Sequence, residues 1–187
     1  MSAYNEPWPR PHRLNVDEYY RMAEVGLLSP DDRTELIEGE IIDMPPIGSR
    51  HAAAVTLLPK RIIRALGDSA DVSVQLPIRL LPRSEPQPDI AVVKHRPDAY
   101  RSAHPTSEDA LLLIEVSDAT LRYDLEVKAR LYATHGIREY WVIDLVNRRL
   151  VRHRTPRGAQ YTQVDVLESG VLELPGFEAE IVLSELW

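Results

Sequence analysis

The sequence has no cysteine among its 187 residues. Disulfide bonds, thiolate catalysis and cysteine-ligated zinc are therefore excluded, and any metal ion must bind oxygen or imidazole ligands. The sequence also lacks an apolar run of the roughly 20 residues that span a bilayer. Residues 1–13 hold charges and prolines instead of the apolar stretch of a signal peptide. We therefore expect a cytoplasmic protein that has no membrane partner.

Several well-known catalytic and nucleotide-binding motifs are also missing. The sequence contains no GxGxxG loop and no Walker A loop, which argues against a nucleotide-binding enzyme of either type. Its six histidines show no HExxH spacing, so a zinc peptidase has little support. None of its serines lies in a nucleophile-elbow motif, which disfavours a serine hydrolase.

The charge balance is acidic, with 29 Asp and Glu against 22 Lys and Arg and a net charge of −7. Such a protein does not hold nucleic acid with its whole surface, so a DNA substrate would need local positive charge. Local positive charge is available in three sets of residues: Arg10, Arg13 and Arg50; Lys60, Arg61 and Arg64; Arg148, Arg149, Arg152 and Arg154. The last group either contacts a nucleic-acid backbone or forms a solvated edge strand.

The composition, with 44% hydrophobic and 27% charged residues, is that of a globular protein. We expect one domain over residues 14–187 that follows a flexible, proline-containing arm over residues 1–13. Asn15 and Glu18 have capping-box spacing and predict a helix from Val16 to Val25. Glu38-Gly39 predicts a tight hairpin turn between two short strands.

The rest of the chain alternates between strand and helix patterns. A helix is expected from His51 to Leu66, with Pro59 kinking or interrupting it, and a second one from Leu121 to His135. Strands are expected over residues 72–80, 90–93, 111–116, 139–145, 150–154, 161–167, 171–174 and 179–183. These elements predict an α/β (α+β) fold with a mixed central sheet, helices packed on it and a β-rich C-terminal segment.

Two carboxylates stand at the ends of adjacent predicted strands. Asp89 follows Pro88 just before the strand at Ile90, and Glu115 lies at the far end of the apolar strand that starts at Leu111. If the strands are neighbours, the two carboxylates converge at one edge of the sheet. Carboxylates held this close repel each other, and a divalent cation usually compensates for this repulsion. Alternatively, Asp89 is a turn residue and Glu115 belongs to a structural ion pair or lies beyond the buried part of its strand.

The helix that follows these strands supplies a third charged residue. On a helical wheel, Lys128 and Asp124 fall inside the apolar stripe that Leu121, Leu125 and Tyr132 define, so Lys128 points at the sheet. Such an ammonium group orients water or stabilises developing charge in phosphoryl chemistry. The structural alternative is that Lys128 pairs with Asp124 four residues earlier or extends its amine to the edge of the core.

Together, Pro88-Asp89, Glu115-Val116 and Lys128 resemble the PD-(D/E)xK nuclease superfamily, and the chain is most similar to its Uma2 family. The resemblance spans roughly Val16 to Leu186. It is carried by residues 35–41, Met44, Pro46, His51, Gln87-Pro88-Asp89 through Val93, Ile114-Glu115-Val116-Ser117, Asp124, Lys128, Tyr132, Gly136 and residues 139–144. It implies a restriction-endonuclease-like sheet. The superfamily lysine usually lies two positions after the second acidic residue, where this chain has Ser117, and the resemblance implies that Lys128 has taken over its role.

The resemblance also implies a mechanism and partners. Asp89, Glu115 and the backbone carbonyl of Val116, with Glu35 as a further ligand, would hold Mg2+ or Mn2+ for hydrolysis of DNA, and Lys128 would orient or activate water. His51, Asp124 and Gln87 would line the site. A homodimer is expected by family analogy. The alternative is a catalytically silent module that kept the nuclease fold for interaction or nucleic-acid binding.

Overall fold

A mixed six-stranded β-sheet forms the centre of the part of the chain that the computed structural model describes, residues 10–29, 31–185 and 187. Its strands follow the order β3 (Ala70–Val74), β4 (Ile90–Lys94), β5 (Ala110–Ser117), β6 (Glu139–Asp144), β7 (Arg149–Arg157) and β8 (Gln160–Leu167). Strands β5 and β6 are parallel and the other neighbours are antiparallel. The predicted α/β fold with a mixed central sheet is confirmed.

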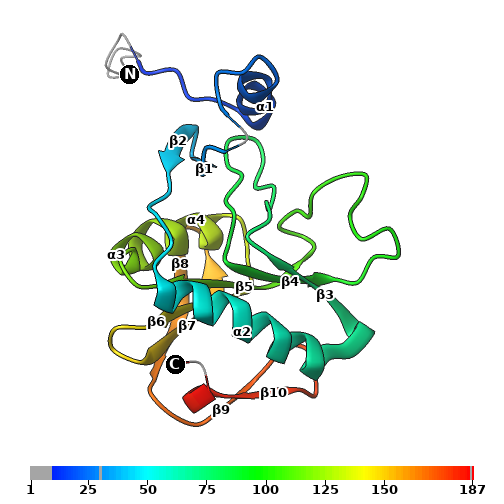
Figure 1. Cartoon of the computed structure of the whole chain (residues 1–187), viewed down its shortest axis with the longest axis vertical. Coiled ribbons are helices and arrows are strands. Elements are labelled where there is room, and N and C mark those ends of the chain that lie inside the picture. Colours follow the sequence, from blue (N-terminus) through cyan, green and yellow to red (C-terminus); the bar gives the residue numbers. More distant parts are fainter. Residues whose placement is uncertain (1–9, 30, 186) are drawn as a thin grey trace, which may run out of the picture.

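Helices cover both faces of this sheet (Figure 1). The long helix α2 (Ser49–Leu66) packs its buried residues on one face, in a core that includes Val92 and Ile114. A helical segment made of α3 (Leu121–Tyr123), a π-helical turn (Asp124–Lys128) and α4 (Ala129–Thr134) packs on the other face. Because side chains alternate along a strand, β4, β5 and β6 contribute to both cores and are almost wholly buried.

The remaining elements lie at the two ends of the chain. Helix α1 (Val16–Glu24) begins at the predicted capping box, in which Asn15 and Glu18 bond to each other's backbone N–H groups. Strands β1 (Thr34–Ile37) and β2 (Glu40–Asp43) form the predicted hairpin, and both turn residues have positive φ. At the other end, β9 (Val171–Glu173) and β10 (Glu180–Val182) form the expected β-rich C-terminal segment.

Four sequence-based expectations need correction. Helix α2 continues through the buried Pro59, because packing of its apolar face compensates for one lost hydrogen bond. Strand β3 ends at Val74, since Gln75 adopts a φ of 51° that no strand accommodates, so residues 75–80 are not a strand. The regular helix over residues 121–135 contains a π-helical turn. Strand β7 is not an edge strand, because β8 pairs with it.

Two further expectations concern the ends and the surroundings of the chain. The arm predicted over residues 1–13 lies for the most part outside the described residues, and within its described part Arg13 pairs with Glu40 of the hairpin. Within the described residues, we find no helix whose length and apolarity would let it cross a bilayer.

Candidate active site

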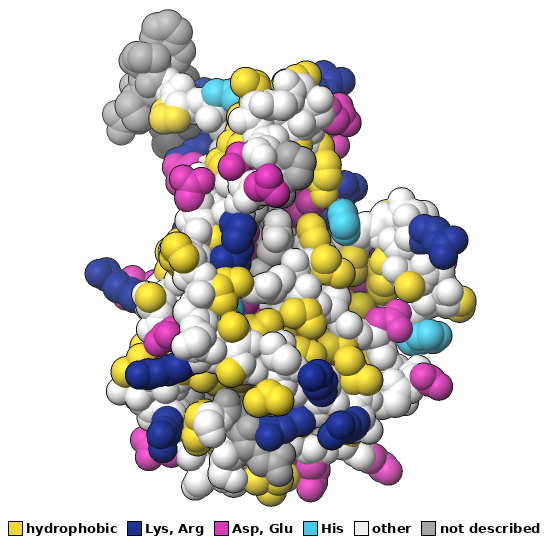
Figure 2. Space-filling model, in the orientation of Figure 1, with side chains coloured by type: hydrophobic (Ala, Val, Ile, Leu, Met, Phe, Trp, Pro, Cys, Tyr) yellow, Lys and Arg dark blue, Asp and Glu magenta, His cyan; other side chains and the backbone are white. Residues whose placement is uncertain are grey.

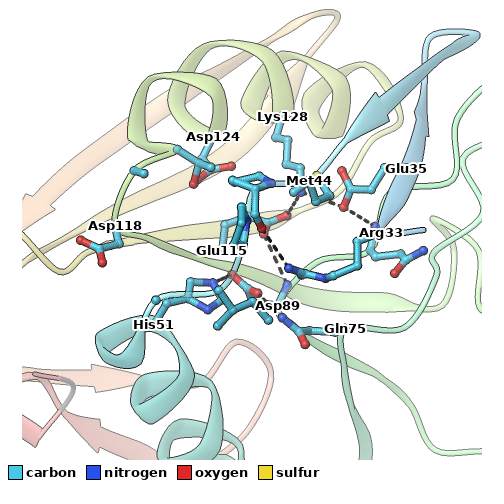
Figure 3. A pocket seen from close by; sticks show the side chains of 17 residues that line it. Arg33, Glu35, Met44, His51, Gln75, Asp89, Glu115, Asp118, Asp124 and Lys128 are labelled. Carbon is cyan, nitrogen blue, oxygen red and sulfur yellow. Dashed lines mark hydrogen bonds and ion pairs between the residues drawn. The ribbon is translucent and has the colours of Figure 1, made fainter. Parts of the chain in front are cut away.

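A polar pocket of about 250 Å³ opens where β4 begins and β5 ends, between the start of α2, the β1–β2 hairpin and the π-helical turn. Figure 3 shows the side chains of Glu35, Asp89, Glu115 and Lys128 pointing toward one another from these elements. The sequence-predicted site residues all contribute to its lining except Val116: Glu35, His51, Gln87, Asp89, Glu115, Asp124 and Lys128. We call this hollow the acid-lined pocket, because Asp118 adds a fifth carboxylate to those of Glu35, Asp89, Glu115 and Asp124.

Strand register brings the first two carboxylates together. Ile90 lies opposite Ile114 in the antiparallel β4–β5 pair, so the residue before Ile90 faces the residue after Ile114. These residues are Asp89 and Glu115, both buried. The backbone N–H of Val116 donates to Asp89 Oδ2 over 2.9 Å, and the N–H of Asp89 lies 3.4 Å from Glu115 Oε2. The convergence expected from the sequence is therefore present.

Lys128 places its ammonium group between two carboxylates. Its Nζ donates to Glu115 Oε1 over 2.8 Å and to Glu35 Oε1 over 3.0 Å, and its side chain is 1% exposed. The residue closes a π-helical turn, in which the N–H of Ala129 bonds to the carbonyl of Asp124 five residues earlier. Such turns insert one residue into a helix and are frequent at functional sites. The structural pairing of Lys128 with Asp124 is wrong.

Asp124 finds different partners on its own side of the pocket. Its Oδ2 accepts hydrogen bonds from Ser117 Oγ over 2.7 Å and from Thr120 Oγ1 over 2.6 Å. Ser117 stands where the superfamily pattern has its lysine, and its side chain lies on the same face of β5 as that of Glu115. The Ser117 hydroxyl thus stands where a lysine on the strand would lie, and the ammonium group of the site belongs to Lys128 on the helical segment.

Glu35 comes from the hairpin, and Gln87 holds it in place. The backbone N–H of Gln87 donates to Glu35 Oε1 over 2.8 Å, and its side-chain amide donates to the carbonyl of Thr34 over 3.2 Å. The second oxygen of Glu35, Oε2, is buried and has no hydrogen-bond partner among the described residues. A buried carboxylate oxygen without a donor is costly, and a cation is one way to satisfy it.

His51 borders the pocket from the first turn of α2. Its Nε2 lies 2.9 Å from Asp89 Oδ2, while its Nδ1 is buried without a hydrogen-bond partner in the described structure. The hydrogen bond to Asp89 raises the pKa of His51, although burial opposes this shift. Burial raises the pKa of Asp89, but His51, with the hydrogen bonds from Val116 and Gln75, outweighs this effect, so that this pKa lies below its ordinary value.

Burial and neighbouring charges shift the pKa values of the other buried charged groups. Burial, together with the neighbouring carboxylates, raises the pKa of Glu115 well above its usual range even though Lys128 lowers it. Burial also raises the pKa of Asp124. Burial alone would lower the pKa of Lys128, but Glu115, Glu35 and Asp124 raise it above the ordinary value. Lys128 is therefore an ammonium ion at physiological pH.

Besides Asp118 and Thr120, three further residues at the site were not among the sequence-predicted ones. Gln75 Nε2 donates to Asp89 Oδ1 over 3.1 Å, and Tyr132 donates its hydroxyl to Glu115 Oε1 over 2.9 Å. Arg33 reaches the mouth of the pocket, where its Nη1 donates to the carbonyl of Pro45 over 3.0 Å. The spacing of Tyr132, four residues after Lys128 on one helix, was a usable signal for its position. Gln75 and Arg33 lie in or beside loops and carry no such signal.

The donors of the pocket fit a hard divalent cation. Among the described residues no three His, Asp or Glu side chains converge as a metal cluster. Mg2+ does not require one, because it usually binds one or two carboxylates, waters and substrate phosphates. Glu35, Asp89, Glu115 and Asp124 are buried with Lys128 as the one buried Lys or Arg among the described residues. This excess of negative charge and the unpaired Glu35 Oε2 both favour a bound cation.

Comparisons with known proteins agree with this picture of the fold. The chain matches the model of the Uma2 family, described as "Putative restriction endonuclease", over residues 16–184. Among solved structures, the crystal structure of "a putative nuclease belonging to DUF820" from Anabaena variabilis superposes with a TM-score of 0.70 at 19% sequence identity. The match covers 92% of this chain and 97% of that one, and at this identity it shows the fold alone. No curated protein matches the chain.

Proposed function

Because the chain belongs to the Uma2 family of nuclease-like proteins, we propose that it is a metal-dependent endonuclease that hydrolyses phosphodiester bonds of DNA. The observation that carries this proposal is the contact of the Lys128 ammonium, 2.8 Å from Glu115 and 3.0 Å from Glu35, beside the buried Asp89. A buried ammonium among excess carboxylates is suited to a reaction in which negative charge develops on phosphate oxygens.

In this proposal Asp89, Glu115 and the backbone carbonyl of Val116 hold Mg2+ or Mn2+, and Glu35 is a further ligand. The ion, when bound, acts as a Lewis acid on the phosphate. Glu35 suits this role because its Oε2 is buried and has no other hydrogen-bond partner among the described residues. His51 and Gln75 hold the carboxylate of Asp89 in one orientation. Gln87 does the same for Glu35.

Lys128 orients the attacking water and stabilises charge. Its raised pKa keeps it protonated, and an ammonium has no lone pair with which to accept a proton. The water oxygen attacks phosphorus and releases its proton to solvent, the bond from phosphorus to one ester oxygen breaks in line with the attack, and the leaving alkoxide takes up a proton from solvent. Asp124 lines the pocket and, through Ser117 and Thr120, ties the end of β5 to the π-helical turn.

The proposal is tested by nicking of supercoiled plasmid with Mg2+ or Mn2+. Wild type and an Asp68→Ala control, which removes an exposed carboxylate outside the pocket, are expected to nick. Asp89→Ala and Lys128→Ala are expected to lose nicking while circular dichroism shows folded protein. Nicking that persists in Asp89→Ala would place the catalytic centre elsewhere.

A second reading is a catalytically silent module, and the unpaired Glu35 Oε2 argues against it, since a site that binds nothing gains nothing from an unsatisfied buried oxygen. Calorimetry with Mg2+ and Mn2+ separates the two. If neither metal binds and wild type does not nick, the silent module is the correct reading. The expected homodimer stays a prediction, for which light scattering is the measurement.

A further inference from the structure

A second hollow lies along α2, next to the acid-lined pocket. It has a volume of about 830 Å³ and is bordered by Arg50, Arg61 and Arg148, with Leu57, Val146 and Trp187 among the residues between them. We call it the arginine groove. Neither it nor any of its residues belongs to the chemistry proposed above.

The three arginines are far apart in the sequence. Arg50 and Arg61 stand on α2, while Arg148 stands in the turn between β6 and β7, at a φ of 48°. Among the described residues that line the groove, none is Asp or Glu, whereas five carboxylates line the pocket beside it. In a chain with a net charge of −7, the exposed Arg50 and Arg148 give the groove a local positive charge that attracts anions.

Two of the three arginines, Arg50 and Arg148, are available for binding. The side chains of Arg50 and Arg148 are exposed, and within the described ranges neither forms an ion pair or a side-chain hydrogen bond. Their neighbours differ: Arg149 binds Asp144 over 2.8 Å, and Arg154 binds Asp165 over 2.7 Å. Arg50 and Arg148 thus keep their guanidinium donors for a ligand.

The shape of the groove suits an extended anion. Its α2 residues recur at helical spacing, from Arg50 through Leu57 to Arg61, and so follow one face of the helix. Eleven residues of α-helix span about 16 Å. A DNA duplex carries one charge per about 1.7 Å of its axis, so several phosphates fall within this length. Figure 2 shows Lys and Arg side chains spread over the part of this face where α2 runs.

The floor between the arginines is apolar. Leu57 is 51% exposed and Val146 is 58% exposed, so the floor offers apolar side chains to a ligand. Sugar rings provide matching contacts, since much of a protein's contact with DNA is to sugar and phosphate and carries no sequence information. A small compact anion would leave this floor uncovered.

We infer that the arginine groove binds the sugar-phosphate backbone of the DNA substrate next to the bond that is cut. This inference rests on the proposed function for the identity of the anion. Arg50 in the groove is followed directly by His51, which contacts Asp89 in the pocket, so a backbone that lies in the groove continues toward the site of hydrolysis. The groove thereby supplies the local positive charge that an acidic nuclease needs.

The test is binding of a fluorescein-labelled DNA duplex in EDTA at several salt concentrations, which requires no catalysis. Each lost phosphate contact lowers the slope of log K against log[salt] by about 0.9, so Arg50→Ala/Arg148→Ala is expected to lower it by about 2. A matched control, Arg21→Ala/Arg101→Ala, removes two exposed charges elsewhere and is expected to keep the wild-type slope. The charge-reversed variant Arg50→Glu/Arg148→Glu is expected to abolish salt-sensitive binding.

Three results would overturn the inference. One is a wild-type slope in Arg50→Ala/Arg148→Ala with unchanged affinity in the reversed variant. Another is wild type that shows no salt-dependent binding of the duplex at all. The third is loss of binding to vesicles of anionic lipid, and not to DNA, in the same variants. Failure of the proposed function is seen separately, as wild type that binds the duplex through these arginines but does not nick plasmid with either metal.

Discussion

The acid-lined pocket and the arginine groove both reach the first turns of α2, yet their charges are built in opposite ways. In the pocket, five charged groups are buried and hydrogen-bonded to other residues, as Lys128 is to Glu35 and Glu115: those of Glu35, Asp89, Glu115, Asp124 and Lys128. In the groove, Arg50 and Arg148 are exposed and have no partner among the described residues.

The buried charges of the pocket and the exposed charges of the groove have different roles. Buried charges interact strongly because little water screens them, and removal of one partner leaves the other uncompensated. Exposed charges contribute little to stability but attract a polyanion in a manner that salt weakens. We therefore expect pocket substitutions to change stability and chemistry, and groove substitutions to change binding alone. Substitutions at single residues distinguish these two roles of charge.

Lys128→Met is expected to have the largest effect on stability. It leaves the carboxylates of Glu35 and Glu115 buried without their cation, which costs about 3–5 kcal/mol, and plasmid nicking falls by on the order of 100-fold or more. Urea denaturation measures the first effect. Arg122→Met, on the exposed side of the same helical segment, is the control and should change stability by less than about 0.5 kcal/mol. A Lys128→Met protein as stable as wild type would contradict the assignment of Lys128 as the compensating charge.

Metal binding is expected to stabilise the folded protein through the same carboxylates. Mg2+ or Mn2+ at about 100 times its Kd adds about 2.7 kcal/mol, because the ion binds the folded state alone. Differential scanning calorimetry should show a higher Tm for wild type and for the exposed control Asp68→Asn, and no shift for Asp89→Asn. Equal shifts in Asp89→Asn and wild type would remove Asp89 from the metal site.

The His51–Asp89 pair is expected to give a smaller, pH-dependent effect. The pKa of His51 is raised in the folded state, so its stabilisation is complete below the ordinary value of 6.5 and is lost as pH rises through the folded pKa. The pKa of Asp89 is lowered, so its contribution is present above 3.8 and is lost as pH falls through the folded pKa. In EDTA, His51→Asn should therefore cost about 1 kcal/mol near pH 6 and progressively less at higher pH.

A matched histidine provides the control for this measurement. His95 forms an exposed pair with Asp71, so His95→Asn should cost clearly less than His51→Asn at the same pH. If the two variants lose the same stability at every pH, burial of the His51–Asp89 pair has no energetic role.

Arg148→Ala is expected to have the smallest effect, within about 0.5 kcal/mol of wild type in denaturation. Its neighbour Arg149 donates to the buried Asp144, so Arg149→Ala should cost about 1–2 kcal/mol. The stabilities of these two variants therefore distinguish an arginine that binds a ligand from an arginine that stabilises the fold. A large loss of stability in Arg148→Ala would show that the groove, like the pocket, is part of the folding energetics.

Local patterns in the sequence account for much of the fold. The capping box at Asn15, the Glu38-Gly39 turn and the apolar strand that contains Glu115 are each specified within a few residues, and each is present. The burial of Lys128 follows from its place on the apolar stripe of its helix. The π-helical turn in this helix could not be predicted from the sequence, because one inserted residue leaves the apolar pattern nearly unchanged.

Long-range packing decided the rest. From the sequence alone it could be predicted that the strand over residues 111–116 is buried and that Asp89 and Glu115 stand at strand ends. Only the tertiary structure decided that Lys128 pairs with Glu35, 93 positions away, instead of Asp124, and that Arg50, Arg61 and Arg148 share one groove. The physical reason is that hydrogen bonds within a turn or helix depend on neighbours in sequence. The partners of buried charges and the members of a surface groove instead depend on how separate elements dock around the core.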